Sequence, residues 1–217
     1  MSRFFGRIKA VVGNSDSQNS VFISDLHLFS PKSVADPDPF WIARRYSDKE
    51  RLLLGGDIFD FRWSRCGSTA ATRSTSEQWL RRLFDRWSGS IAYLPSNHDS
   101  HPEFLRLLDR FQEQISEFTW EFYFARFGDV ICLHGDVCGA GSSDELTSYR
   151  ARFHSHRPNS AVAHAAYDLA VAMRIHRLIP FLRHQFTDVC HFLADEVRRI
   201  AANSAGVRTV IFGHTHY

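Results

Sequence analysis

Short apolar runs recur along the chain, and each one ends in a cluster of polar residues. Five of these runs occupy residues 21–23, 51–54, 91–94, 130–133 and 207–212. Near-continuous apolar runs of this length are typical of central strands that are covered on both faces, as in an α/β sheet. We therefore predict five buried strands, each of which delivers polar side chains at its carboxyl end.

Helical patterns lie between these strands. Residues 76–88 and 101–115 carry apolar side chains at helical spacing. The long interval before the last strand predicts two more helices, over residues 161–177 and 181–202, hinged near Pro180. We expect a single domain over residues 1–217, with a core of residues 20–137 and 205–217. Residues 138–204 would form a helical insertion, a candidate cap over the site.

The polar residues at the strand ends form a set suited to metal binding. Carboxylate, amide and imidazole ligands suit divalent first-row metals such as Mn, Fe, Zn or Ni. Side chains two apart on an extended strand point the same way, so each Asp-x-His or His-x-His pair can enter one site. Seven ligands exceed the needs of one ion but suit two ions that share a carboxylate, and such a pair can clamp a phosphoryl group and activate water. The set is Asp25, His27, Asp57, Asn97, His134, His214 and His216.

Five ordered motifs contain these residues: Asp25-x-His27, Gly56-Asp57-x-x-Asp60, Asn97-His98-Asp99, His134-Gly135-Asp136 and Gly213-His214-Thr215-His216. Together they resemble the motifs of the calcineurin-like metallophosphoesterase superfamily. The resemblance implies a four-layer α-β-β-α sandwich with a helical cap insertion, and hydrolysis of a phosphate ester or pyrophosphate bond. Because family members usually continue beyond the last motif, it also implies that C-terminal strands of the second sheet are missing.

The resemblance further implies which residues hold each metal. One divalent ion would take Asp25, His27, Asp57 and His216, and the other would take Asp57, Asn97, His134 and His214. Asp57 would bridge the two ions, and a metal-bridging hydroxide would be the nucleophile. Manganese is the expected metal, with iron, zinc and nickel as alternatives.

The third motif is expected to supply the residues that act on the substrate. Asn97 and His98 would contact it, and His98 would either stabilise the transition state or protonate the leaving oxygen. Asp99 would orient His98, as carboxylates commonly orient imidazoles in metal sites. Partners of the ligands are expected at Asp60 and Asp136.

A finer resemblance is to the UDP-2,3-diacylglucosamine pyrophosphatases of lipid A synthesis. It rests on residues 24–28 (Ser-Asp-Leu-His-Leu), on residues 56–60 (Gly-Asp-Ile-Phe-Asp) and on the helical insertion. It implies a UDP-sugar-lipid substrate. Two positions depart from the pattern. Those enzymes typically have arginine where this chain has His98, and the superfamily usually has glycine where this chain has Ser96, a position that would be strained if its φ were positive.

The composition of the chain indicates its cellular compartment and the classes of partner that it could bind. The net charge of +2 and the absence of a basic stripe argue against nucleic acid. The four cysteines form no CxxC pair, which favours a reducing compartment, and no apolar run is long enough for a signal peptide or a membrane span. We expect a cytoplasmic protein with peripheral contact to the inner membrane face. Its partner would be a phosphorylated small molecule or a lipid-linked substrate, with no obligate protein partner.

Two other functions stay open. Related repair nucleases share Asn-His-Asp, so a nuclease-like phosphodiesterase is one alternative. A non-catalytic scaffold, or an inactive fragment of the same fold, is an alternative of another class. The seven histidines outside the motifs are interpreted as solvated helix positions and the five tryptophans as packing residues. A solvated helix face is the preferred interpretation of Arg174, Arg177 and Arg183, with phosphate or anionic lipid contact as the other.

Overall fold

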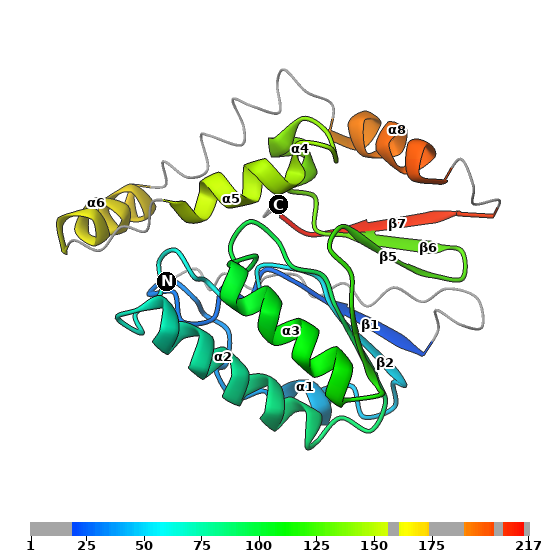
Figure 1. Ribbon diagram of the computed structural model, residues 1–217, viewed down its shortest axis with the longest axis horizontal. Coiled ribbons are helices and arrows are strands. Elements are labelled where there is room, and N and C mark those ends of the chain that lie inside the picture. Colours follow the sequence, from blue (N-terminus) through cyan, green and yellow to red (C-terminus); the bar gives the residue numbers. More distant parts are fainter. Residues whose placement is uncertain (1–18, 156–160, 174–188, 202–205, 215–217) are drawn as a thin grey trace.

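The computed structural model describes residues 19–155, 161–173, 189–201 and 206–214, which form two stacked sheets between two layers of helices (Figure 1). The first sheet has the order β1-β2-β3-β4, with all neighbours parallel, and the second has the order β5-β6-β7. In the second sheet β5 runs antiparallel to β6, whereas β7 is parallel to it. The predicted four-layer α-β-β-α architecture is thereby confirmed.

All five predicted strands are present. They are β1 (Ser20–Ile23), β2 (Arg51–Leu54), β3 (Ser90–Tyr93), β6 (Val130–Leu133) and β7 (Thr209–Phe212). The sequence patterns did not predict β4 (Phe118–Trp120) or β5 (Phe124–Phe127). Among the described strands, β1 and β7 lie at the edges of their sheets, so the prediction that all five are central strands was wrong for these two.

Three helices cover the outer face of the first sheet: α1 (Phe40–Arg45), α2 (Thr69–Phe84) and α3 (Pro102–Gln114). Helix α2 begins seven residues earlier than predicted because the Ser68 hydroxyl caps it, accepting a hydrogen bond from the Ala71 N–H. Helix α3 begins at Pro102, a residue whose fixed φ suits the first turn, and it buries Phe104, Leu107, Leu108 and Phe111. These side chains join the strand residues in one apolar core.

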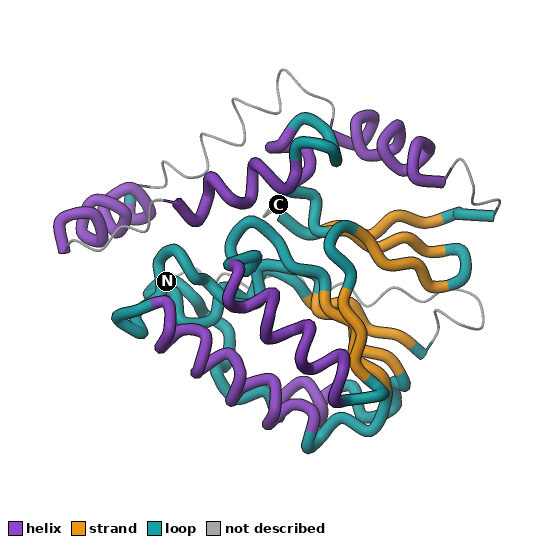
Figure 2. Tube along the Cα trace, viewed as in Figure 1, coloured by secondary structure: helices purple, strands orange, loops and turns teal. Residues whose placement is uncertain are grey.

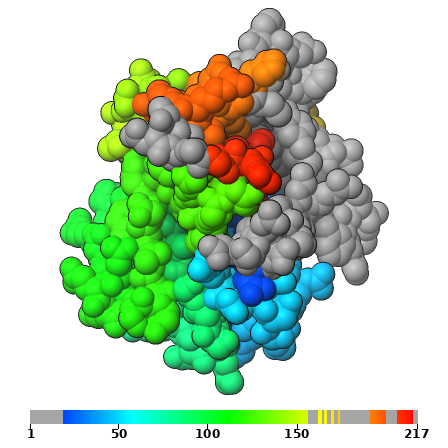
Figure 3. Space-filling model, turned by 90° about the vertical axis from the view of Figure 1, so that its right-hand side faces the viewer, coloured from blue at the N-terminus to red at the C-terminus, as the bar shows by residue number. Residues whose placement is uncertain are grey.

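Helices also cover the second sheet: α4 (Val137–Ala140), α5 (Leu146–Ser155) and α8 (Val189–Ala201). Figure 3 shows α8 lying over β7 at one edge of the molecule. Leu193 and Val197 of α8 are buried in one cluster with Ile131 and Leu133 of β6, so these apolar positions of the predicted helix 181–202 belong to the core. A third, smaller cluster, which includes Leu53 and Val130, joins the two sheets.

Helix α6 (Ala161–Ala172) lies at one end of the molecule, beyond the helices that cover the sheets (Figure 1). It falls within the predicted helix 161–177. The hinge at Pro180, the first part of the second predicted helix and the three arginines at positions 174, 177 and 183 lie outside the described residues.

Candidate metal centre

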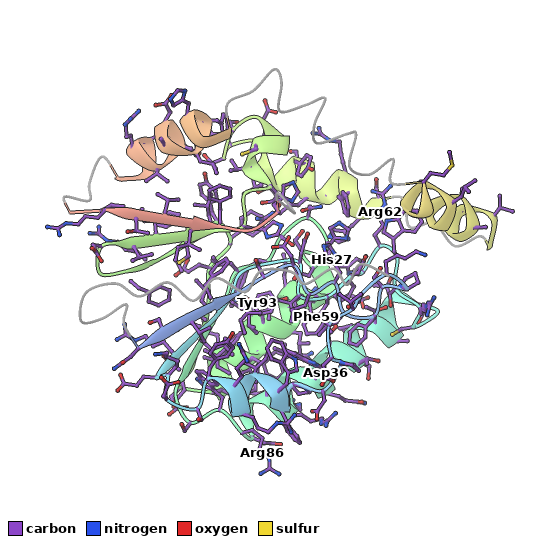
Figure 4. All side chains as sticks on the ribbon, turned by 180° about the vertical axis from the view of Figure 1, so that it is seen from behind. His27, Asp36, Phe59, Arg62, Arg86 and Tyr93 are labelled. Carbon is purple, nitrogen blue, oxygen red and sulfur yellow. The ribbon has the colours of Figure 1, made fainter. Side chains whose placement is uncertain are left out.

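The loops that leave the carboxyl ends of the strands gather on one side of the two sheets (Figure 2). Backbone hydrogen bonds join the first two motifs, from the Asp25 N–H to the Gly56 carbonyl (3.0 Å) and from the His27 N–H to the Asp57 carbonyl (2.8 Å). Open α/β sheets place their ligand sites at these strand ends. In Figure 4, His27 lies at the junction of the two halves, above Phe59 and Tyr93, whereas Arg86 lies at the far end.

Backbone strain is concentrated in these loops. Among the described residues, five that are not glycine have positive φ, and four of these are predicted ligands: Asp25 (58°), His27 (45°), Asp57 (53°) and His214 (72°). A side chain in this region costs of order 1–3 kcal/mol, so such residues persist only where their surroundings hold them. The concentration of strain is what a functional site would show.

One set of possible metal ligands comprises His27, Asp57 and His98, whose ligand atoms all lie within 4.8 Å of one another. His27 Nε2 is 3.4 Å from Asp57 Oδ2. The His27 and His98 rings meet edge to face, with centroids 4.6 Å apart. His98 thus belongs to a possible ligand set, although the motifs predict that it contacts the substrate.

A second set comprises Asp57, His134 and His214, again within 4.8 Å of one another. His134 Nε2 is 3.3 Å from the same Oδ2 atom of Asp57. On the other side of its ring, Nδ1 lies 2.9 Å from the Gly55 carbonyl, which can only accept, so Nδ1 carries the proton in this contact. Nε2 is then directed at Asp57, an arrangement usual for metal-binding histidines.

Buried polar atoms without a partner test whether these residues fit a cation. Among the described residues, six buried side-chain atoms make no hydrogen bond of good geometry, and four of them belong to the site: Asn97 Oδ1, His98 Nδ1, His134 Nε2 and His214 Nδ1. The other two are the indole nitrogens of Trp41 and Trp79. A buried polar atom left in this state costs about 1–3 kcal/mol. Amide oxygen and imidazole nitrogen coordinate divalent first-row metals, and three of the four site residues are predicted ligands, so the residues fit such an ion.

Asp25 lies against the last motif. Its carboxylate accepts a hydrogen bond from the His214 backbone N–H (3.0 Å to Oδ1) and another from the Ser24 hydroxyl (2.5 Å). A Cβ on Gly213 would lie 2.4 Å from Asp25 Oδ2, so this close approach requires glycine. Asp25 belongs to neither three-residue set, and His216 lies outside the described residues.

Buried carboxylates and histidines in the site shift one another's pKa values. Burial by itself would raise the pKa of Asp57, but the charges of His134, His98 and His27 together hold it well below its usual value. Burial lowers the pKa of His134, and the Asp57 carboxylate more than reverses this, raising it to about 10. In the absence of metal, therefore, protons on His134 and His98 balance the carboxylates that a cation would otherwise neutralise. His214 differs, because burial and the neighbouring His134 lower its pKa to about 4.

The predicted partnership of Asp99 with His98 was wrong. Asp99 instead accepts hydrogen bonds from the Tyr93 hydroxyl (2.7 Å), the Ile58 N–H (3.0 Å) and the Ser96 N–H (2.6 Å). Asp60 takes the expected place, with Oδ1 3.2 Å from His98 Nδ1. The loop after β3 directs the Asp99 side chain toward Tyr93 and away from His98. Through the bond from the Ile58 N–H, the Asp99 carboxylate connects the third motif to the second.

The sequence motifs also missed residues of α5 and of the loop after β2. The Phe153 ring lies 4.6 Å from the His98 ring, and the Arg62 guanidinium lies 4.6 Å from the centre of the same Phe153 ring. His154 contacts Ser100 Oγ at 3.3 Å and meets the His101 ring, so it is not the solvated histidine that was predicted. No local motif marks these positions, since only tertiary packing brings α5 to the site.

Comparison with known proteins agrees with this geometry. A search of curated proteins finds no match to the chain. None of the described helices is long and apolar enough to cross a bilayer. The family model for calcineurin-like phosphoesterase matches residues 19–217, a range that includes both possible ligand sets. With this match over nearly its whole length, the chain belongs to the calcineurin-like phosphoesterases, a family of metal-dependent hydrolases.

Proposed function

We propose that this phosphoesterase uses two divalent metal ions to hydrolyse a phosphate ester or pyrophosphate bond. The observation that carries the proposal is the sharing of Asp57 between the two possible ligand sets. Its Oδ2 atom faces His27 Nε2 at 3.4 Å and His134 Nε2 at 3.3 Å, so one carboxylate oxygen is directed at both sets. When two ions share a carboxylate, they can stabilise both the attacking and the leaving oxygen of a phosphoryl transfer.

The proposed ligands come from loops of both sheets. His27 and Asp25 would serve one ion, and His134, His214 and Asn97 would serve the other, with Asp57 between them. When bound, the ions would supply an activated water molecule and neutralise charge on the phosphoryl group. His216 is proposed for the first ion from the motif alone. Mn²⁺ is the first ion to test, since the ligands are carboxylate, amide and imidazole.

His98 is proposed to act on the substrate, because Asp60 already holds one nitrogen of its ring. Asp60 Oδ1 lies 3.2 Å from Nδ1, so a proton on that nitrogen is stabilised and the ring is held in place. Burial lowers the pKa of His98, but Asp57 and Asp60 raise it to about 9 in the absence of metal. A protonated His98 could stabilise negative charge on a phosphoryl oxygen or protonate the leaving group.

A lipid-linked substrate is proposed from exposed apolar side chains on the insertion, residues 138–204. Val162 and Leu169 on α6 are 78% and 60% exposed, and Met173, directly after the helix, is 62% exposed. Their spacing of seven and four residues places them on one helical face. Such a face could contact an acyl chain, so we propose that α6 contributes to a cap that favours lipid-linked pyrophosphates such as UDP-diacylglucosamine.

The test is a substrate screen on the chelator-treated protein, with and without added Mn²⁺. The panel would contain UDP-diacylglucosamine, nucleotide pyrophosphates and simple phosphodiesters, with metal content measured in parallel. We expect activity only with metal and two ions bound per chain. Asp57→Ala should lose both ions. Full activity after chelation, or two ions retained by Asp57→Ala, would refute the proposal.

The cap is tested separately by Leu169→Ser, with Val34→Ser as the control, since Val34 is also an exposed apolar residue (74%) but lies outside the insertion. We expect Leu169→Ser to lower kcat/KM for the lipid-linked substrate only. Equal rates of wild type and Leu169→Ser on that substrate would rule out the acyl contact.

A further inference from the structure

Ser96 lies fully buried between two carboxylates at the base of the site. Its hydroxyl oxygen accepts a hydrogen bond from the Asp57 N–H (2.7 Å). The same oxygen is in hydrogen-bond contact with Asp57 Oδ1 and lies 2.9 Å from Asp99 Oδ1. Ser96 therefore contacts both the backbone and the side chain of the residue that the two possible ligand sets share.

The Ser96 hydroxyl has one proton, which it can donate to either Asp57 or Asp99. The other donors around each carboxylate indicate which of the two receives it. Asp99 already accepts hydrogen bonds from three donors, the Tyr93 hydroxyl and the backbone N–H groups of Ile58 and Ser96. From the described part of the chain, Asp57 Oδ1 receives only the long contact from the His98 N–H (3.3 Å) besides Ser96. Donation to Asp57 thus leaves neither carboxylate without a donor.

This contact fixes which oxygen of Asp57 faces the metal ligands. With Oδ1 held by Ser96, Oδ2 is the atom directed at His27 Nε2 and His134 Nε2, at 3.4 and 3.3 Å. We propose that Ser96 is a positioning residue, which holds the Asp57 carboxylate in the rotation that presents Oδ2 to both metals. The inference rests on the metal sites of the proposed function, but it does not require that any particular substrate be hydrolysed.

There is room for a side chain at position 96 because Gly56, which lies beside it in space, has no side chain. Ser96 is not among the residues with positive φ, so serine is unstrained where glycine is usual in the family. A Cβ on Gly56 would lie 2.8 Å from the Ser96 Cβ and 2.6 Å from His134 Nδ1. Gly56, with a φ of 84°, therefore leaves the space that the Ser96 side chain occupies.

The experiment compares metal binding by Ser96→Ala and the wild type, using calorimetric titration of the chelator-treated protein with Mn²⁺. Loss of a residue that orients a metal ligand typically lowers metal affinity about 10–100-fold. We expect a loss of at least about tenfold at both sites, and an altered visible absorption spectrum after loading with Co²⁺. Ser76→Ala is the matched control, because Ser76 is equally buried but donates to the Thr72 carbonyl within α2.

Unchanged affinity at both sites in folded Ser96→Ala would overturn the inference. If Ser96→Ala does not fold, Ser96→Gly provides the same comparison with no added atoms. Because the readout is metal binding, an inactive but metal-binding wild type would refute the proposed function and leave this inference standing.

Discussion

Arg150 and Asp136 form a two-pronged ion pair inside the second half of the molecule. Arg150 Nε donates to Asp136 Oδ2 at 2.8 Å and Nη2 donates to Oδ1 at 2.9 Å, and both side chains are only 2% exposed. Nη1 donates to the Phe122 carbonyl at 2.6 Å. Burial would raise the pKa of Asp136, but Arg150 lowers it below its usual value. The pair fixes α5 to the motif that carries His134.

Arg150→Met should destabilise the protein by about 3–5 kcal/mol, because it leaves the Asp136 carboxylate buried without a counter-charge. Chemical denaturation of both proteins would measure this. Arg152→Met, at an exposed position on the same helix, is the control and should change stability by less than about 0.5 kcal/mol. If the two variants are equally stable, the ion pair contributes little.

His98→Ala should retain two metal ions and lose about 10²–10⁴-fold in kcat, if His98 serves the substrate as proposed. The loss should be smaller for substrates with good leaving groups, which need no proton. Metal analysis and steady-state kinetics on the same preparation would separate the two possible roles of His98. Loss of one ion from His98→Ala would instead make it a ligand, a role that its place in the first set also permits.

The strained backbone gives a prediction about stability without metal. His27 has a φ of 45°, a conformation that costs a residue with a side chain about 1–2 kcal/mol but costs glycine little. Glycine is normally about 0.5–1 kcal/mol less stable than alanine because its unfolded chain is freer. We therefore expect metal-free His27→Gly to equal or exceed His27→Ala in free energy of unfolding.

Ser76→Gly and Ser76→Ala provide the reference pair for this comparison. Ser76 lies within α2, where alanine should be more stable than glycine by about 1 kcal/mol. The same ranking at His27 would mean that the loop relaxes when the histidine is removed.

Glu196 links α8 to the second sheet in a manner that depends on pH. Burial would raise its pKa, but hydrogen bonds from Tyr123, Ser143 and Arg199 lower it below the usual value near 4.5. Because the folded pKa is the lower one, the stabilisation is present above about pH 4.5 and is lost as the pH falls through the folded value. Glu196→Gln should therefore weaken the decline in stability between pH 6 and pH 3, measured by denaturation at each pH.

Tyr123→Phe tests the same link from the other side. The Tyr123 hydroxyl donates to Glu196 Oε1 at 2.8 Å, so its removal should reduce this pH dependence in part. A pH profile identical to that of wild type in both variants would contradict the assignment.

The positions of the proposed ligands could be located from sequence because strand ends are a local signal. Asp25, Asp57 and His134 each lie within three residues of the end of an apolar run. The parallel pairing of β1 with β2 brings the first two together, and the stacking of the second sheet on the first brings His134 to them. What the sequence could not supply was the partner of each ligand. Asp99 directly follows His98 in the third motif, whereas Asp60 belongs to the second, and only the turn of each loop decides that Asp60 faces His98.

Two short strands could not be predicted because they, too, lack a local sequence signal. Strands β4 and β5 span three and four residues, and their burial patterns mix buried, intermediate and exposed side chains. Without a continuous apolar run, they resemble loops. Arg150 was missed because a buried arginine is recognised only by its partner, and Asp136 lies 14 residues away in the sequence.

The hydrogen bond from His214 to Asp25 joins residues 189 positions apart, and this separation sets an order of assembly. Among the described residues, the buried apolar core of the first sheet runs from Val21 to Phe118, and the partly buried residues packed on it extend only to Trp120, so this half can pack before the last strand exists. During synthesis, His27, Asp57 and His98 can therefore be in place while the second set still lacks His214. A partly made chain would then be able to hold an ion on the first set before His216 is added, and the second set would be completed only when β7 pairs with β6.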